Sequence, residues 1–188
     1  MRVLSANECS DWLYERGIGL SPRNYPLVRE PEVLEFPIPH HAGELVALAY
    51  MFGDMEKVAR GGGILVIREW SIGSPGLDAL GHETVKRMLG MNGGEVDTDQ
   101  PLQVELDGSE SALVASLLLQ SMIFGWDAFY VPASGAFLIF VSHDEVAYVA
   151  APNPAFGEDV SVQFERLSVG TVATPYYLLQ AKQSVIAH

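Results

Sequence analysis

Apolar residues recur along this chain with two spacings, one typical of helices and one typical of strands. From 42 to 60 they return every three to four positions, which predicts an amphipathic helix. Ser5 followed by Glu8 matches a capping box, so we expect another helix that starts there and ends at Gly17. Further helices are expected from 75 to 89, where Pro75 suits the first helical turn, and from 109 to 124, which is apolar nearly all round.

Strand patterns fill the stretches between these helices. ILVIREW (64–70) is a β-branched run that predicts a buried strand, and 102–106 alternates apolar and polar residues. AFYVP (128–132), AFLIFV (136–141) and EVAYVA (145–150) are separated by short polar turns, which predicts a β-meander.

Two regions give weaker signals. Five prolines lie between 21 and 39, so that region should be irregular, with one short strand at 33–36. In the tail, 158–167 fits strand or helix equally well, whereas 174–187 looks helical because Thr174 and Pro175 open it. We therefore predict one α+β domain over 1–188, with a mixed, mostly antiparallel sheet packed against three to five helices.

The charge of the chain narrows the classes of partner. With 24 acidic and 11 basic residues, the formal net charge is -13. Such a surface repels phosphate backbones, which disfavours nucleic-acid binding, and it attracts basic proteins. Solubility alone is the simpler explanation of this charge.

Cysteine use and hydropathy bear on the compartment. Cys9 is the single cysteine, which fits a reducing cytoplasm. The start of the chain lacks an apolar signal core, and the uncharged run between Glu110 and Asp127 is too short to span a membrane comfortably. We expect a cytoplasmic protein with no membrane contact.

The tetrad Ser142-His143-Asp144-Glu145 is the strongest candidate for chemistry. It lies between two apolar runs, where an antiparallel hairpin needs a short polar connection. Adjacent residues of a tight turn point in different directions, so they make a poor metal clamp. We interpret the tetrad as a turn, and the alternative is that Asp144 or Glu145 presents a carboxylate to a ligand or partner.

Other candidates are weaker. His40 and Glu44 have metal-ligand spacing, but Pro37 and Pro39 favour a loop entering the helix. The stretch beginning at His82 starts like a zinc-protease motif, but Lys86 stands where the second histidine is required. Cys9 is expected to be a small core residue. We predict no catalytic residue, no metal and no cofactor.

Two aromatic–acid pairs, Glu69-Trp70 and Trp126-Asp127, suggest a binding surface. Tryptophan is enriched at binding hot spots, and aromatic rings among carboxylates suit a basic partner. The alternative is that both indoles fill the core and donate hydrogen bonds to nearby carbonyls.

Three segments, LSANECSDWL, REWSIG and FGWDAFYVPASGAFLIFVSHDEV, resemble a loosely defined family of uncharacterised bacterial proteins. The resemblance implies that the two aromatic–acid pairs and the tetrad share one surface or one structural corner. It implies no activity. Small acidic α+β proteins of this kind are also similar in class and charge to bacterial immunity proteins.

The residues predicted to form the binding surface are Glu69, Trp70, Trp126, Asp127, His143, Asp144 and Glu145. The first hypothesis is a non-catalytic protein-binding module, of the immunity type, that neutralises a basic partner. The second is a small hydrolase or metal-dependent enzyme that uses His143 with Asp144 or Glu145. The third is a structural subunit that buries its apolar surplus in a homodimer.

Overall fold

The structure, a computed structural model, describes residues 1–28, 32–59, 61–70, 75–91 and 100–151. The helices in these ranges are α1 (Ala6–Tyr14), α2 (Ala42–Ala59), α3 (Pro75–Met88) and α4 (Ser111–Phe124). The strands are β1 (Arg2–Val3), β2 (Gly19–Leu20), β3 (Pro26–Leu27), β4 (Glu32–Pro37), β5 (Gly63–Glu69), β6 (Leu102–Leu106), β7 (Asp127–Pro132), β8 (Leu138–Ser142) and β9 (Val146–Ala151).

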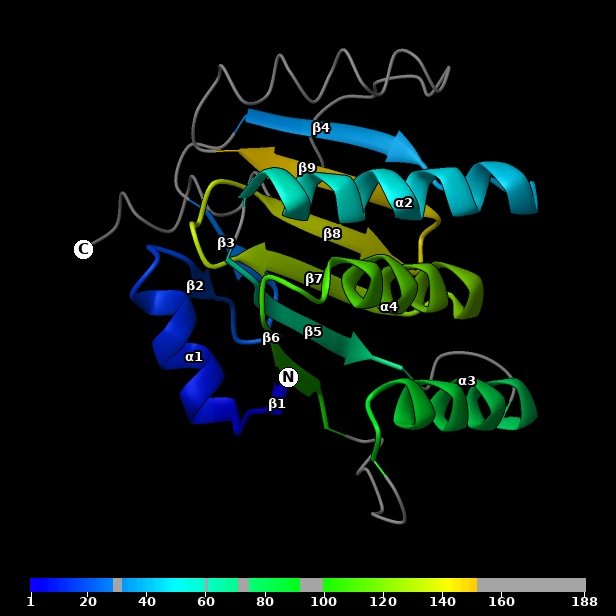
Figure 1. The fold of residues 1–188 in the computed structure, drawn as a ribbon, viewed down its shortest axis with the longest axis horizontal. Helices are drawn as coiled ribbons and strands as arrows, with labels where there is room; N and C mark the ends of the chain where they lie inside the picture. Colours follow the sequence, from blue (N-terminus) through cyan, green and yellow to red (C-terminus); the bar gives the residue numbers. More distant parts are fainter. Residues whose placement is uncertain (29–31, 60, 71–74, 92–99, 152–188) are drawn as a thin grey trace.

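Seven of these strands form one sheet in the order β1-β6-β5-β7-β8-β9-β4. Every described pairing is antiparallel, and β2 pairs with β3 in a separate two-stranded sheet. Strands β6 and β7 flank β5, so the chain crosses β5 through α4 between them (Figure 1). The remaining neighbours β7, β8 and β9 form the predicted meander.

The two faces of the large sheet carry separate apolar clusters. Helices α2, α4 and α3 lie side by side over one face, where Leu65, Ile67 and Tyr130 point (Figure 1). Helix α1 covers part of the other face, where Val66 and Phe129 point. The near-continuous apolar sequence of β5 and β7 follows from this arrangement, because strands covered on both faces need apolar residues at every position.

Local signals account for several element boundaries. The capping box predicted for α1 is present: the Ser5 hydroxyl accepts from the Glu8 amide, and the Glu8 carboxylate accepts from the Ser5 amide. Helix α4 ends at Gly125, whose φ of 65° lies in the left-handed region that glycine adopts without strain.

The α+β prediction with a C-terminal-half meander is confirmed, and the short strand expected at 33–36 is β4. The sequence did not predict the two-residue strands β1, β2 and β3, because so few residues carry no periodicity. The expectations for 158–167 and 174–187 lie outside the described residues. None of the described helices has the length and apolar character needed to cross a membrane.

Candidate functional site

The candidate site lies where several strands end together. β5 ends at Glu69 beside the start of β7 at Asp127, and the turn that begins at His143 joins β8 to β9. Because these strands are antiparallel neighbours, the three residues converge at one end of the sheet. The fold therefore brings three of the predicted site residues together at this corner.

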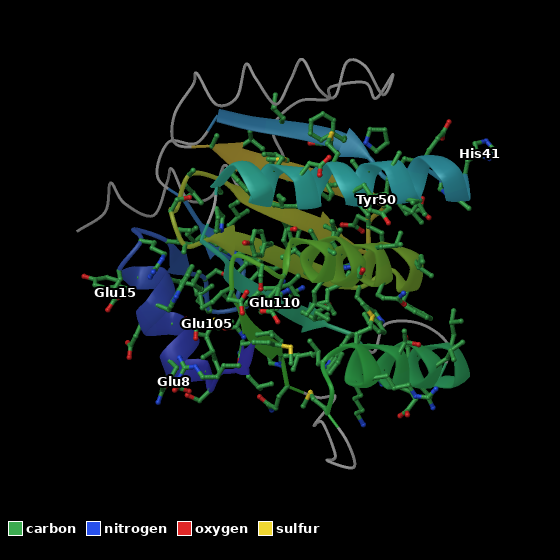
Figure 2. The ribbon with its side chains drawn as sticks, viewed as in Figure 1. Glu8, Glu15, His41, Tyr50, Glu105 and Glu110 are labelled. Atoms are coloured by element: carbon green, nitrogen blue, oxygen red, sulfur yellow. The ribbon has the colours of Figure 1, made fainter. Side chains whose placement is uncertain are left out.

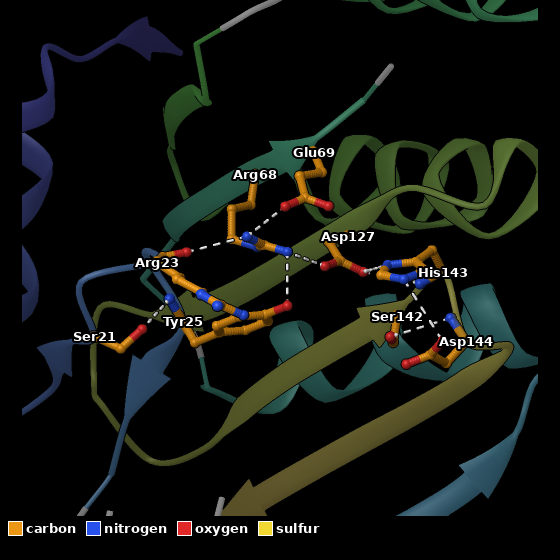
Figure 3. Close-up of polar contacts among 9 residues, drawn as sticks. All are labelled: Ser21, Arg23, Tyr25, Arg68, Glu69, Asp127, Ser142, His143 and Asp144. Atoms are coloured by element: carbon orange, nitrogen blue, oxygen red, sulfur yellow. Dashed lines mark hydrogen bonds and ion pairs between the residues drawn. The ribbon is translucent and has the colours of Figure 1, made fainter. Parts of the chain in front are cut away.

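A buried arginine holds this corner together. Arg68 donates from Nη2 to Asp127 Oδ2, and also to the Tyr25 hydroxyl at 2.8 Å (Figure 3). Its Nη1 lies 2.7 Å from Glu69 Oε1 and donates to the Arg23 carbonyl at 3.1 Å. The Tyr25 ring lies 4.0 Å from the guanidinium carbon. Arg68 therefore links the β2–β3 connection to both carboxylates.

Asp127 is the centre of the network and is fully buried. Its Oδ1 accepts from the His143 backbone amide at 2.9 Å and lies 2.8 Å from His143 Nδ1 (Figure 3). An ionised carboxylate only accepts hydrogen bonds, so the imidazole proton is placed on Nδ1. Nε2 then points away from Asp127, with Asp144 Oδ1 at 3.6 Å.

The contacts shift two protonation equilibria in opposite directions. Burial by itself raises the pKa of Asp127, but hydrogen bonds from Arg68 and His143 outweigh it and hold the pKa below its ordinary value. Burial by itself lowers the pKa of His143, but the hydrogen bond to Asp127 and its negative charge outweigh it and raise the pKa. Asp127 is therefore ionised, and His143 gains a proton more readily than a free histidine.

Glu69, Asp127 and His143 are also the candidate metal ligands among the described residues. One ligand atom from each lies within 4.8 Å of the others. Arg68, however, already contacts both carboxylates and places a permanent positive charge beside them. A divalent cation would have to compete with that charge, so the donor set fits an ion-pair network better than a metal centre.

The tetrad is a hairpin turn, as predicted. Residues 143–145 form the connection, and Glu145 adopts a left-handed φ of 62°. The Asp144 and Glu145 side chains are exposed, and His40 Nε2 lies 3.8 Å from Glu145 Oε2. Of the tetrad, only His143 contributes its side chain to the buried network.

The structure places Trp70 and Trp126 in the core, which corrects the expectation that they bind a partner. Their exposed fractions are 1% and 0%. The Trp70 indole donates to the Gln100 carbonyl at 3.2 Å, and the Trp126 indole donates to Asp78 Oδ1 at 3.3 Å. Burial of large apolar rings outweighs any gain from exposing them, so the alternative interpretation holds.

The remaining candidates lie outside the buried network. His40 precedes α2, as expected, and is exposed. His82 stacks on Trp126 with ring centroids 5.4 Å apart. Cys9 is buried, and burial raises the pKa of its thiol to about 11, which opposes a nucleophilic role.

The sequence analysis missed Arg68 and Tyr25. A usable signal was present in ILVIREW, where one arginine interrupts a run that is otherwise apolar up to Glu69. A charge in a strand covered on both faces requires a buried partner, which points to an acidic residue on a neighbouring strand. Comparison with family models, curated proteins and solved structures gave no match.

Proposed function

We propose that this chain is a non-catalytic binding protein that recognises a basic segment of a partner protein. The contact surface is an acidic corner made by the carboxylates of Glu69, Asp144 and Glu145. Their side chains are 46%, 70% and 69% exposed. Glu69 and Asp144 lie beside the half-exposed imidazole of His143, and Glu145 follows Asp144 in the same turn, near His40. The observation that carries the proposal is that the buried Arg68–Asp127 pair holds this corner: Arg68 contacts Glu69, and Asp127 holds His143 at the start of the turn that carries Asp144 and Glu145.

The buried Arg68–Asp127 pair matters because it fixes the conformation of the turn before a partner binds. His143 is held to Asp127 through both its backbone amide and its ring. The Glu145 amide donates to the Ser142 carbonyl, and the Glu145 carbonyl accepts from the Ile38 amide at 2.8 Å. A turn fixed on both sides loses little conformational entropy on binding, so more of the interaction energy appears as affinity.

Charge acts at two ranges in this proposal. The net charge of -13 draws a basic partner toward the protein and speeds the encounter. Acidic side chains are also exposed elsewhere, such as Glu8 of α1 and Glu15 just after that helix (Figure 2). Long-range attraction therefore belongs to the whole surface, whereas docking belongs to the corner. In an immunity-type role, this protein would cover a basic active site of the partner that it binds.

The test separates docking from general attraction with two variants of equal charge. One variant is E69Q/D144N/E145Q, and the control is D11N/E15Q/E44Q, whose positions are also exposed. Each is titrated by calorimetry with an oligo-arginine peptide at about 20 mM and about 300 mM salt, where screening differs strongly. We expect the corner variant to bind at least about tenfold more weakly than the control at low salt.

Equal weakening in the two variants would contradict the proposal, because it would mean that net charge alone attracts the peptide. Absence of binding by the wild-type protein at low salt would also contradict it. By the same criterion, a natural partner would be a basic protein that binds the wild type and the control variant but not the corner variant.

A second candidate function is general acid–base catalysis by His143. The observation in its favour is the pairing of Nδ1 with buried Asp127, which orients the ring and leaves Nε2 directed away. The test is hydrolysis of nitrophenyl esters and phosphates by the wild type and by H143A. Activity that H143A retains, or no activity in the wild type, would remove this candidate.

A further inference from the structure

A cavity of about 270 Å³ lies on the α1 side of the large sheet. Its floor is a row across three neighbouring strands, since Gln103 of β6, Val66 of β5 and Phe129 of β7 are register partners in turn. Cys9 of α1 also lines it. The cavity is distinct from the acidic corner, because none of that corner's three carboxylates lines it.

The size of the cavity limits its occupant. Ligand sites usually enclose about 300 to 1,000 Å³, so this one lies just below that range. A single planar ring with one small polar group fits that space better than a nucleotide or a peptide segment.

The described residues of the lining are uncharged. Val66 and Phe129 supply apolar surface, and burial keeps the Cys9 thiol protonated at neutral pH because it raises the pKa to about 11. No Asp, Glu, Lys, Arg or His is among the described lining residues. No cation lies among the described lining residues to offset the net charge of -13, which repels anions. The occupant is therefore expected to be neutral.

Three primary amides border this apolar floor: Asn24 and Gln100, which are exposed at its rim, and Gln103, which is half-buried. Within the described ranges, no side-chain hydrogen bond from any of the three to another residue is found. Asn24 is held in a left-handed turn, with φ 59° and its backbone amide bonded to the Ser21 carbonyl. Each carboxamide offers both donors and an acceptor, a set that complements another amide.

The geometry points to a binding site for a small neutral molecule that carries a carboxamide or cyclic amide on a planar ring. The ring packs on Val66 and Phe129, and its amide exchanges hydrogen bonds with the side chains of Gln103, Gln100 and Asn24. This site and the acidic corner are independent, and either can exist without the other.

The experiment is a titration with benzamide followed by the side-chain NH₂ signals of the protein in ¹H–¹⁵N correlation spectra. We expect saturable shifts at Asn24, Gln100 and Gln103. Benzoate, which has the same shape with a charge, is expected to bind at least about tenfold more weakly. Q103E keeps the shape of the side chain but replaces its NH₂ donor with a charge, and we expect it to weaken benzamide binding about tenfold.

The matched control is Q120E, since Gln120 lies on α4, which covers the opposite face of the sheet. It adds the same charge and should leave benzamide affinity unchanged, and unperturbed backbone spectra would show that both variants fold. The inference is overturned if benzamide gives no saturable shifts at the three amides, if benzoate binds equally well, or if Q103E and Q120E behave alike.

Discussion

Where β5 ends beside the start of β7, neighbouring residues build the two faces of the sheet. One face is stabilised by aromatic packing and the other by a buried ion pair. On the α3 side, Trp70 and Trp126 pack edge to face, with ring centroids 6.1 Å apart. On the other side, Arg68 and Asp127 form a buried ion pair. In the sequence, Trp70 lies two positions after Arg68, and Trp126 immediately precedes Asp127.

The two sides should differ in how strongly single substitutions destabilise them. Aromatic packing depends on shape, so a small change in volume costs a graded amount of stability. A buried ion pair depends on both partners, because losing one leaves a charge without compensation. We therefore expect the polar side to be the more sensitive to single substitutions.

The largest expected effect is that of R68M. It removes the guanidinium and leaves the buried Asp127 with His143 as its one donor among the described residues, so the free energy of unfolding should fall by about 3 to 5 kcal/mol. Urea denaturation followed by tryptophan fluorescence measures this. The double variant R68M/D127L removes both charges and should be more stable than R68M. If the single substitution is harmless, the ion pair does not hold this corner together.

The next effect tests the aromatic side with G81A. A Cβ at Gly81 would lie 2.6 Å from Cζ2 and Cη2 of Trp126, a buried ring with no room to move. We expect a loss of about 1 to 3 kcal/mol in the same denaturation experiment. The control is G76A in the same helix, where a Cβ meets nothing within 4 Å. It should be neutral or stabilising by up to about 1 kcal/mol. Equal effects would mean that contact with Trp126 is not the cause.

The smallest effect is that of H143A, and it depends on pH. The pKa of His143 is higher in the folded protein than in the unfolded chain, where it is near 6.5, so protonation of this residue stabilises the fold. The stabilisation is complete below the unfolded pKa and is lost as the pH rises through the folded pKa. The free energy of unfolding of the wild type should exceed that of H143A by about 1 kcal/mol or less at low pH. The difference should be smaller in alkaline solution. Denaturation at about pH 5.5 and about pH 8.5 measures the difference. A gap that widens with pH would contradict the raised pKa.

The elements with strong periodicity were predictable, and their contacts were not. The alternation in 102–106 and the apolar runs of the meander gave the strands of the α+β fold, and β5 starts one residue from its predicted position. The turn at Ser142 to Glu145 followed from its polar sequence. The pairing of Arg68 with Asp127 did not, because 59 residues separate them and only strand order brings them together.

By itself, the sequence determined where helices and strands form, since local periodicity, capping residues and turn residues act over a few neighbours. It also determined the acidic surface. Only the tertiary structure decided which side of the sheet each residue of the two aromatic–acid pairs occupies. Trp70 and Trp126 lie just beyond β5 and β7, and a β-bulge between Ile67 and Glu69 interrupts the alternation of β5. Arg68 therefore pairs with Asp127 while both indoles enter the core on the helix-covered face. Register depends on contacts between distant segments, and no local pattern encodes it.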